Sequence, residues 1–451
     1  MSDGRLITYQ HSGWSPATAW ALQRFSPTRN QRSRIRRRII HRHTDELHEL
    51  FELFGAGDRL HHTQSRADLE RGRFVVPLSL VAYYFLSPDF PKNRLGYSIY
   101  EALSSHERRA LGDLDGRLLL GLVTEAFFAS EEYVEKFHLE LERWDIDPAQ
   151  VVVLNNNLRS EEAYQLACAS LGYSRRALIL PFPGNYWLLV GRESRRSDAA
   201  VSARADAAYS TLRSGRGRSF KFLSFNGKVR PHRLYVVLYL LSRGLLDEGK
   251  VSLLAFNPGE RDSSDDLLSM LDQFPANEDL RSYVPELMAR MPLILDLAPG
   301  RAPASSMFVS QDPSLYDDSY FSIVTDTLFA DESMLYLTEK PFKAILNLHP
   351  FVYLGSRESL AELRQMGYET FAPWIDETYD TVADPSTRMT LVLHEIDRLA
   401  RLSHDELHEM YCKLWPRLKH NYDLLTREAS VRYLEEAQAK IWSRCGLSVF
   451  N

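Results

Sequence analysis

Residues 220–256 read FKFLSFNGKVRPHRLYVVLYLLSRGLLDEGKVSLLAF. The first six residues form a short apolar, aromatic-rich run, which is typical of a buried strand. A turn then leads to Pro231, which suits the first position of a helix because the amide it lacks would have no partner there. The apolar stretch 231–243 predicts that helix, and the run that begins at Val251 predicts the next strand. A strand–helix–strand order of this kind predicts parallel strands.

The same alternation continues in both directions along the chain. Further short apolar runs predict strands at 74–80, 118–123, 151–154, 177–181, 186–190, 322–325 and 351–354. Helical periodicity lies between several of them, and the sequence beyond Pro385 is helical in pattern. A chain of 451 residues is also too long for one ordinary hydrophobic core. We therefore predict an α/β protein with two Rossmann-like domains facing across a cleft and a helical C-terminal extension.

The domain boundaries follow from shifts in composition. The stretch between the two series of strands is rich in Ser, Arg, Ala and Gly, which indicates a linker or loop. Ser403 and Glu406 have the spacing of a capping box, which predicts a helix start in the extension. The predicted parts are a basic N-terminal arm (1–45), an N-terminal Rossmann-like domain (46–195), a linker (196–218), a C-terminal Rossmann-like domain (219–400) and the helical extension (401–451).

Composition narrows the class of protein. Hydrophobic residues make up 44% of the chain and charged residues 25%, with a net charge of −6, which favours a globular protein over a nucleic-acid-binding one. Three cysteines without metal-ligand spacing indicate a reducing compartment. No leader-like segment and no run of about 18 apolar residues is present, so we expect a cytoplasmic protein.

A basic run at 32–43 is the exception to the acidic balance. Such a run can dock to an anionic membrane surface, and it can bind nucleic acid in a salt-dependent way. Acidic residues that begin at Asp45 and Glu46 follow it directly, and we favour a solvated arm or helix face whose charge is neutralised locally. We expect peripheral membrane contact at most, and no nucleic-acid partner.

One candidate site lies where the strand at 220–225 meets its helix. Ser224, Asn226, Arg230, His232 and Arg233 occupy this junction. A helix N-terminus carries a partial positive charge, and arginine matches the oxygen pairs of a phosphate. The carboxyl end of a parallel strand is also where α/β folds bind ligands. The alternative is an ordinary surface helix start.

A second candidate site follows the predicted strand at 322–325. Asp326 ends that strand, Thr338 can cap the next helix, and Glu339 and Lys340 fall in its first turn. A lysine at this position opposes the helix dipole, which makes more sense if an anion binds beside it. A capped helix with a local Glu–Lys pair is the alternative.

Together these residues resemble a known signature. Asp326, the triplet Thr338-Glu339-Lys340 and the run PFVYLG at 350–355 resemble the donor site of α-1,3-fucosyltransferases, which are GT-B glycosyltransferases. Ser224-x-Asn226…Arg230 is similar to that family's Ser-Asn…Arg element. The chain also resembles glycosyltransferases of bacterial and viral surface-polysaccharide gene clusters. The resemblance covers roughly residues 218–400.

The resemblance implies roles for these residues. Glu339 would hold the nucleotide ribose, Arg230 and Lys340 the diphosphate, and Asp326 would lie close to the donor sugar. His349 precedes Pro350 where the family has a small or apolar residue. His-Pro pairs occur in bacterial sialic-acid and Kdo transferases, where the histidine contacts the CMP phosphate. A CMP-sugar donor is therefore an alternative to a GDP-sugar.

The N-terminal half supplies a candidate general base. Glu125 follows the predicted strand at 118–123, the position from which a carboxylate could deprotonate an acceptor hydroxyl. A solvent-facing glutamate is the alternative. We predict Glu125 and Asp326 as the catalytic residues.

An acidic-aromatic segment at 374–380 follows the second candidate site. Its carboxylates could bind sugar hydroxyls, but we favour a role in fixing the loop.

No metal-ligand pattern, Gly-x-Gly-x-x-Gly or Walker motif is present. The sequence therefore predicts a glycosyltransferase that needs neither metal nor cofactor. It would move a sugar from a nucleotide-sugar donor to a saccharide or lipid-linked glycan hydroxyl, in surface polysaccharide or glycolipid assembly. A non-catalytic sugar-nucleotide or glycan-binding protein on the same scaffold is the alternative from another class.

Overall fold

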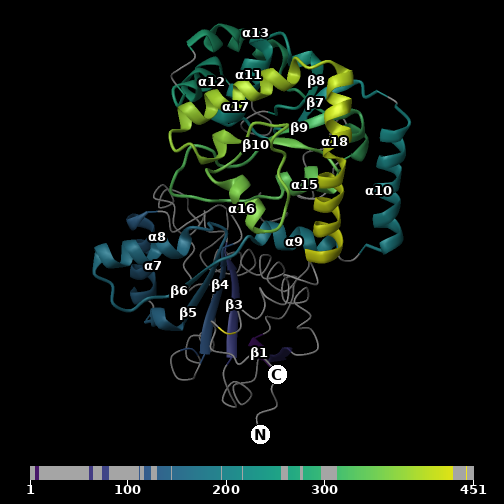
Figure 1. The fold of residues 1–451 in the computed structure, drawn as a ribbon. Helices are drawn as coiled ribbons and strands as arrows, with labels where there is room; N and C mark the ends of the chain where they lie inside the picture. The colour runs from purple at the N-terminus through teal and green to yellow at the C-terminus, as the bar shows by residue number, and fades with distance from the viewer. Residues whose placement is uncertain are drawn as a thin grey trace, which may run out of the picture. The chain divides into compact units, whose positions relative to one another are not determined.

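The computed structural model describes residues 6–9, 60–63, 74–80, 111, 116–122, 130–143, 145–193, 196–215, 217–254, 263–274, 278–295, 312–429 and 443. They fall into two compact units (Figure 1). Unit 1 contains the described residues up to Gly191 together with 333–336, and unit 2 contains those in 192–332 and 337–430. No helix in these ranges is long and apolar enough to cross a bilayer.

Unit 1 is built on a six-stranded sheet. Its order is β2-β1-β3-β4-β5-β6, and every neighbouring pair is parallel. The strands are β1 (Leu6–Tyr9), β2 (Leu60–Thr63), β3 (Phe74–Leu80), β4 (Gly116–Leu122), β5 (Val151–Asn155) and β6 (Leu178–Pro181). All of β5 is buried, as expected for a strand inside a parallel sheet whose two faces are covered.

Two helices of unit 1 pack against each other through their apolar faces. They are α7 (Glu131–Arg143) and α8 (Ser160–Leu171), and α8 ends at Gly172, whose φ of 77° favours glycine. A third helix, α9 (Gly184–Glu193), follows β6. The short segment 333–336 joins this unit through Leu335, whose carbonyl accepts a 2.8 Å hydrogen bond from the Leu158 amide.

Unit 2 is built on a four-stranded parallel sheet of order β10-β9-β7-β8. The strands are β7 (Phe220–Ser224), β8 (Gly249–Val251), β9 (Ser319–Thr325) and β10 (Phe351–Leu354). From β7 the chain passes through α11 (Pro231–Ser242) to β8 on one side. From β9 it passes through α15 (Lys340–Leu346) to β10 on the other side. The strand order therefore reverses between β7 and β9, and such a switch point is where α/β sheets bind ligands.

The apolar helix α11 of unit 2 packs against α12 (Ser264–Leu271), α13 (Val284–Arg290) and α17 (Pro385–Ala400). Every residue of α11 from His232 to Leu241 is buried, which marks it as an interior helix rather than an amphipathic surface one. The other helices are α10 (Asp198–Arg213), α14 (Pro313–Asp317), α16 (Ser359–Gln365) and α18 (His404–Asp423), which continues into a π-helical turn (Leu424–Glu428).

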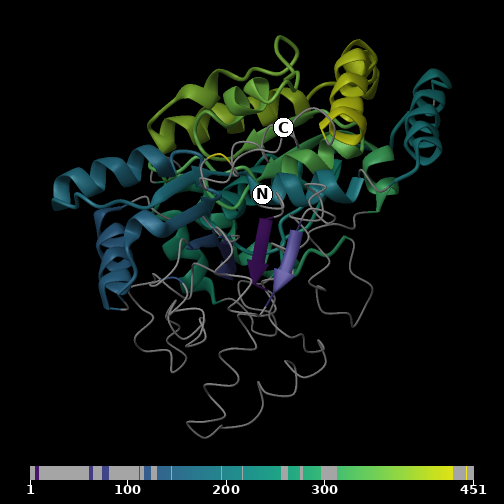
Figure 2. The same ribbon diagram turned by 90° about the horizontal axis from the view of Figure 1, so that it is seen from below.

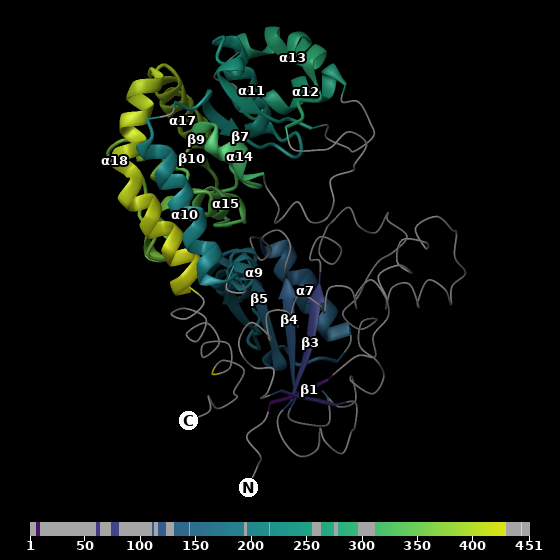
Figure 3. The same cartoon turned by 90° about the vertical axis from the view of Figure 1, so that its right-hand side faces the viewer.

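The predicted linker at 196–218 is largely helical. Ser197 caps α10 by accepting a 3.3 Å hydrogen bond from the Ala200 amide. The buried face of α10 consists of Val201, Ala205, Ala208 and Leu212. Figures 2 and 3 show α10 beside α18, and the Tyr422 hydroxyl on α18 donates a 3.0 Å hydrogen bond to the Val201 carbonyl. Half of these four residues are alanine, so composition alone does not distinguish the segment from a linker.

Other sequence predictions have mixed outcomes. The two-part α/β fold with parallel sheets is confirmed, as is the capping box of Ser403 and Glu406 at the start of α18. That helix belongs to unit 2. The run 186–190 lies in α9 rather than in a strand, because so short an apolar run fits either. β1 lies within the segment predicted as an arm, and the basic run 32–43 lies outside the described residues.

Candidate functional site

A buried amide joins the carboxyl ends of three strands in unit 2. Asn226 Oδ1 accepts a 2.6 Å hydrogen bond from the Thr325 hydroxyl at the end of β9. Its Nδ2 donates to the Ser252 carbonyl at 2.9 Å and to the Ser224 hydroxyl at 3.1 Å. Ser224 and Asn226 are fully buried, so this geometry makes them supports of the sheet edge rather than exposed ligand contacts.

Two side chains of α11 form hydrogen bonds to the residue that follows β9. His232 Nε2 and an Arg233 terminal nitrogen each donate to the Asp326 carbonyl at 2.9 Å. The His232 ring also stacks on Phe329, with centroids 5.7 Å apart. His232 and Arg233 are both buried, and these bonds fix where the first turn of α11 lies.

Three cations converge on this edge. Burial, together with the charges of Arg233, Arg230 and Lys340, lowers the pKa of His232 from 6.5 to about 3. Arg233 bonds to the Asp326 carbonyl at 2.9 Å and the Lys340 ammonium lies 3.7 Å from Oδ1 of the same residue, so the two sequence motifs meet at Asp326. Arg230 is partly exposed at the start of α11 and gives the helix no side-chain cap. The edge is therefore electropositive and partly open.

Asp326 is enclosed by protein donors. Its Oδ1 accepts from the Thr327 amide at 2.5 Å, and its Oδ2 accepts from the Thr338 amide at 3.3 Å and from the Tyr353 hydroxyl. The side chain is completely buried, and the Lys340 ammonium lies 3.7 Å from Oδ1. This arrangement favours a positioning role over the direct contact with the donor sugar that the family resemblance implies.

Lys340 is the most accessible charged group of the second motif. Its side chain is 24% exposed, and its ammonium lies 3.4 Å from Glu339 Oε1. It also donates to the Thr338 hydroxyl at 3.2 Å and to the Thr327 hydroxyl at 3.3 Å. Glu339 is buried apart from 10% of its side chain, and Lys343 lies 3.8 Å from the same Oε1. Lys340 thus places a partly accessible ammonium group beside Asp326, just beyond the carboxyl end of β9.

His349 lies apart from these residues. Its Nε2 donates to the Ser319 carbonyl at 2.6 Å, and its Nδ1 accepts from the Ser322 hydroxyl at 2.7 Å. Ser319 begins β9 whereas Asp326 follows its end, so His349 packs toward the amino end of the strand. It is also fully buried. This position gives no support to His349 as a phosphate ligand, nor to the CMP-sugar alternative that depends on it.

The buried His349 should make stability depend on pH. Burial lowers its pKa from 6.5 to about 3, so between these values the unfolded chain binds a proton that the folded chain does not. Its contribution to stability is thus complete above pH 6.5 and is lost as the pH falls toward 3. At pH 5 the loss should be about 2 kcal/mol.

Urea unfolding at pH 7 and pH 5 measures this loss. His349→Gln should reduce the difference between the two pH values by about 2 kcal/mol, whereas His394→Gln, at an exposed histidine, is the matched control. An unchanged difference in His349→Gln would contradict the buried neutral imidazole.

Several functional contacts involve residues that the sequence did not single out. The Tyr353 hydroxyl contacts Asp326, and a Cβ on Gly355 would lie 2.8 Å from the Tyr353 ring, which explains the glycine after this tyrosine. Arg388 is buried and bonds to Glu332 at 2.7 Å and to the Phe329 carbonyl, so it holds the loop that follows β9. No local pattern predicts that contact.

The acidic-aromatic segment has the structural role that we favoured. Glu377 accepts hydrogen bonds from the Phe371 amide and the Thr370 hydroxyl, and Asp380 accepts from two amides that begin α16. The predicted base, Glu125, lies outside the described residues.

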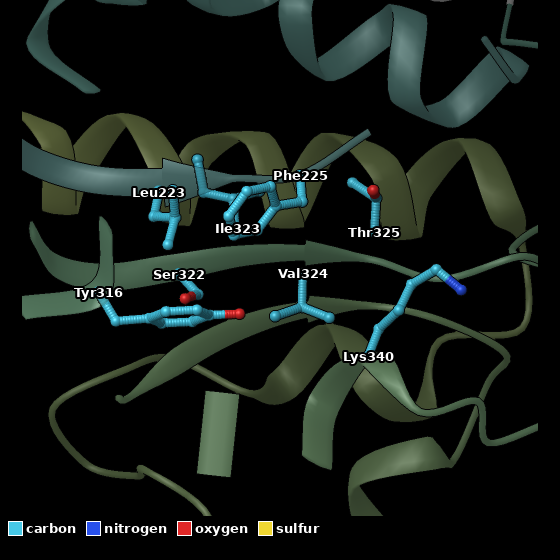
Figure 4. Close-up of a pocket in the computed structure, with 8 residues that line it drawn as sticks. All are labelled: Leu223, Phe225, Tyr316, Ser322, Ile323, Val324, Thr325 and Lys340. Atoms are coloured by element: carbon cyan, nitrogen blue, oxygen red, sulfur yellow. The ribbon is translucent and has the colours of Figure 1, made fainter. Parts of the chain in front are cut away.

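A small pocket opens beside the electropositive edge (Figure 4). Its cavity volume is about 30 Å³. Its lining consists of Leu223, Phe225, Tyr316, Ser322, Ile323, Val324, Thr325 and Lys340. Lys340 thus belongs both to the pocket and to the group of cations around His232.

Comparison with known proteins gives only remote likenesses. No protein-family model and no curated protein matches the sequence. Among solved structures, the chain is similar to the N-terminal domain of Candida albicans trehalose-6-phosphate phosphatase, with 11% identity, a TM-score of 0.42, and 98% of this chain and 90% of that one covered. It is also similar to the α,α-trehalose 6-phosphate synthase of Burkholderia multivorans (12% identity, TM-score 0.40, 99% of each chain). A third likeness is the UDP-forming α,α-trehalose-phosphate synthase of Burkholderia vietnamiensis (11%, 0.38, 91% and 88%). Likenesses at this level assign neither donor nor acceptor.

Proposed function

We propose that this chain is a glycosyltransferase whose nucleotide-sugar donor binds at the carboxyl ends of β7 and β9. The observation that carries the proposal is that Arg233 and Lys340 meet at Asp326, at the switch point of the unit 2 sheet, and that Arg230 begins the helix to which Arg233 belongs. Two of these cations, Arg230 and Lys340, are partly exposed there. A diphosphate is the anion that such a cluster beside a strand-to-helix turn fits best.

The same cations support transfer without a divalent metal. The leaving group of a nucleotide-sugar is a nucleoside phosphate, and fixed positive charges stabilise the negative charge that develops on it. The carboxylates at this edge, Asp326 and Glu339, already face lysine ammonium groups at 3.4–3.8 Å. Because these carboxylates are paired, the described side chains suit phosphate better than a metal ion.

The acceptor side of the proposal rests on the sequence. Glu125 is proposed as the base that deprotonates a saccharide hydroxyl. The fucosyltransferase-like motif favours a deoxyhexose or hexose donor and a role in surface polysaccharide or glycolipid assembly. We further propose a cytoplasmic location, with the basic run 32–43 contacting an anionic membrane surface.

Titration calorimetry with pyrophosphate, UDP, GDP and CMP, each in the presence of EDTA, tests the donor site. We expect pyrophosphate to bind, and one nucleotide to bind more tightly than the rest, with no loss of affinity to the chelator. Binding that requires added magnesium, or no binding of any of the four, would refute the proposed site.

Turnover separates the enzyme from a sugar-nucleotide-binding protein. Nucleotide release from the preferred donor should depend on a saccharide acceptor and should be lost in Glu125→Ala. Tight binding without release under any acceptor would favour the non-catalytic alternative.

A further inference from the structure

The pocket beside Lys340 has an aromatic wall that the cations do not explain. Phe225 and Tyr316 contact each other with ring centroids 5.9 Å apart and planes inclined by 45°. Figure 4 shows Tyr316 toward one end of the pocket, Lys340 toward the other and Phe225 between them. A ligand whose phosphate meets Lys340 would therefore extend its next group toward the rings.

Neighbouring contacts hold this wall in place. Tyr316 is 3% exposed, and its carbonyl accepts a 2.6 Å hydrogen bond from the buried Arg218. Phe225 directly follows β7 and lies between Ser224 and Asn226, both of which are fixed in the sheet edge. Phe225 itself remains partly exposed. Phe225 therefore offers part of its ring to a ligand in the pocket that Lys340 also lines.

The other lining residues indicate which chemical groups the pocket can hold. Leu223 on β7 is paired with Ser322 on β9, so both side chains lie on one face of the sheet. Side chains alternate along a strand, which places Phe225 and Val324, each two residues further on, on that same face. The floor beneath the rings is thus largely apolar. The cavity itself is only about 30 Å³, far below the roughly 300 Å³ of small-molecule pockets, so a flat ring would lie against its open side and a whole sugar nucleotide would not enter it.

We propose that Phe225, backed by Tyr316, stacks against the nucleobase of the donor, while Lys340 meets its phosphates. This inference rests on the proposed donor site and assigns its base-binding part. A flat, largely uncharged base gains from stacking on an aromatic ring whatever its hydrogen-bonding pattern. The apolar face of the donor sugar is the competing occupant, and the experiment separates the two.

Calorimetry on Phe225→Leu, with Phe225→Tyr as the conservative control, tests the assignment. In the wild-type protein we expect the preferred nucleoside diphosphate to bind more tightly than pyrophosphate. Phe225→Leu should weaken nucleotide binding about tenfold or more and leave pyrophosphate binding unchanged. Phe225→Tyr should keep most of the nucleotide affinity, and an unchanged thermal midpoint in both variants shows that they fold.

The outcomes distinguish this inference from the proposed function. If pyrophosphate binds but the nucleoside adds no affinity, or if Phe225→Leu leaves nucleotide affinity unchanged, the stacking assignment is wrong while the phosphate site stands. If Phe225→Leu weakens a hexose 1-phosphate and not the nucleotide, the sugar occupies the wall and the assignment is overturned. If neither pyrophosphate nor nucleotide binds, both proposals fail.

Discussion

Removing either exposed cation is expected to weaken pyrophosphate binding about ten- to hundredfold. The two variants are Arg230→Gln and Lys340→Met, each of which keeps most of the side-chain length. A hydrogen bond to a charged group contributes about 1.5–3 kcal/mol, which corresponds to this range of affinity. Both cations lie near His232 at the switch point, whereas the terminal nitrogens of Arg233 bond to backbone carbonyls and so make it a poorer test.

The matched controls come from the same unit. Arg243 follows the last turn of α11, at the opposite end of the helix from Arg230, and is exposed. Lys413 on α18 is likewise exposed and pairs with Glu409. Arg243→Gln and Lys413→Met should leave pyrophosphate affinity within about twofold, because screened charges distant from a site contribute little. Equal losses in the controls would mean that the anion responds to net charge and not to a built site.

Lys340→Met also removes the counter-charge of the buried Asp326, so its thermal midpoint must be measured beside its affinity. Arg230→Gln removes the other cation, whose partly exposed side chain begins α11. If Lys340→Met unfolds at a lower temperature and Arg230→Gln does not, the pyrophosphate affinity of Arg230→Gln decides whether these cations form a phosphate site.

The fold of unit 2 could be predicted from the sequence where local signals agree. The strand at 220–225, Pro231 at the first helical position and the apolar run to 243 all point to the same structure, and the protein has β7 and α11 there. α10 could not be predicted in this way, because half of its four buried residues are alanine and its partner, α18, lies some 200 residues away in the sequence.

The candidate site could be predicted only in part, for a related reason. The sequence predicts Arg230 and Lys340 at one edge because each follows a strand, and parallel strands bring their carboxyl ends together. The order of the strands decides which residues of the two candidate sites are buried. Asn226 contacts Thr325 only because β7 lies next to β9, and no local pattern reveals that neighbour. The partly exposed Phe225 was missed because it sits between two polar motif residues.

Asp326→Asn is expected to lower the free energy of unfolding by about 3 kcal/mol. The carboxylate is completely buried, and both of its oxygens accept hydrogen bonds. An asparagine turns one acceptor into a donor, which then faces either the Thr327 amide or the Thr338 amide and Tyr353 hydroxyl. Hydrogen bonds to a charged group contribute about 1.5–3 kcal/mol each, and a donor left unsatisfied adds a further cost. Because Lys340 is partly exposed, the lost ion pair adds less than a fully buried one would.

Asp318→Asn is the control, because Asp318 directly precedes β9 whereas Asp326 directly follows it. Asp318 pairs with Lys250 at 2.9 Å but is 36% exposed, so Asp318→Asn should cost about 1 kcal/mol or less. Urea unfolding of the two variants measures both values. A direct catalytic role for Asp326 makes the opposite prediction: Asp326→Asn would then keep the wild-type stability and donor affinity but lose turnover at saturating donor. A positioning role requires stability and donor affinity to fall together, because the loop that carries Thr338 and Lys340 is held to β9 through this carboxylate.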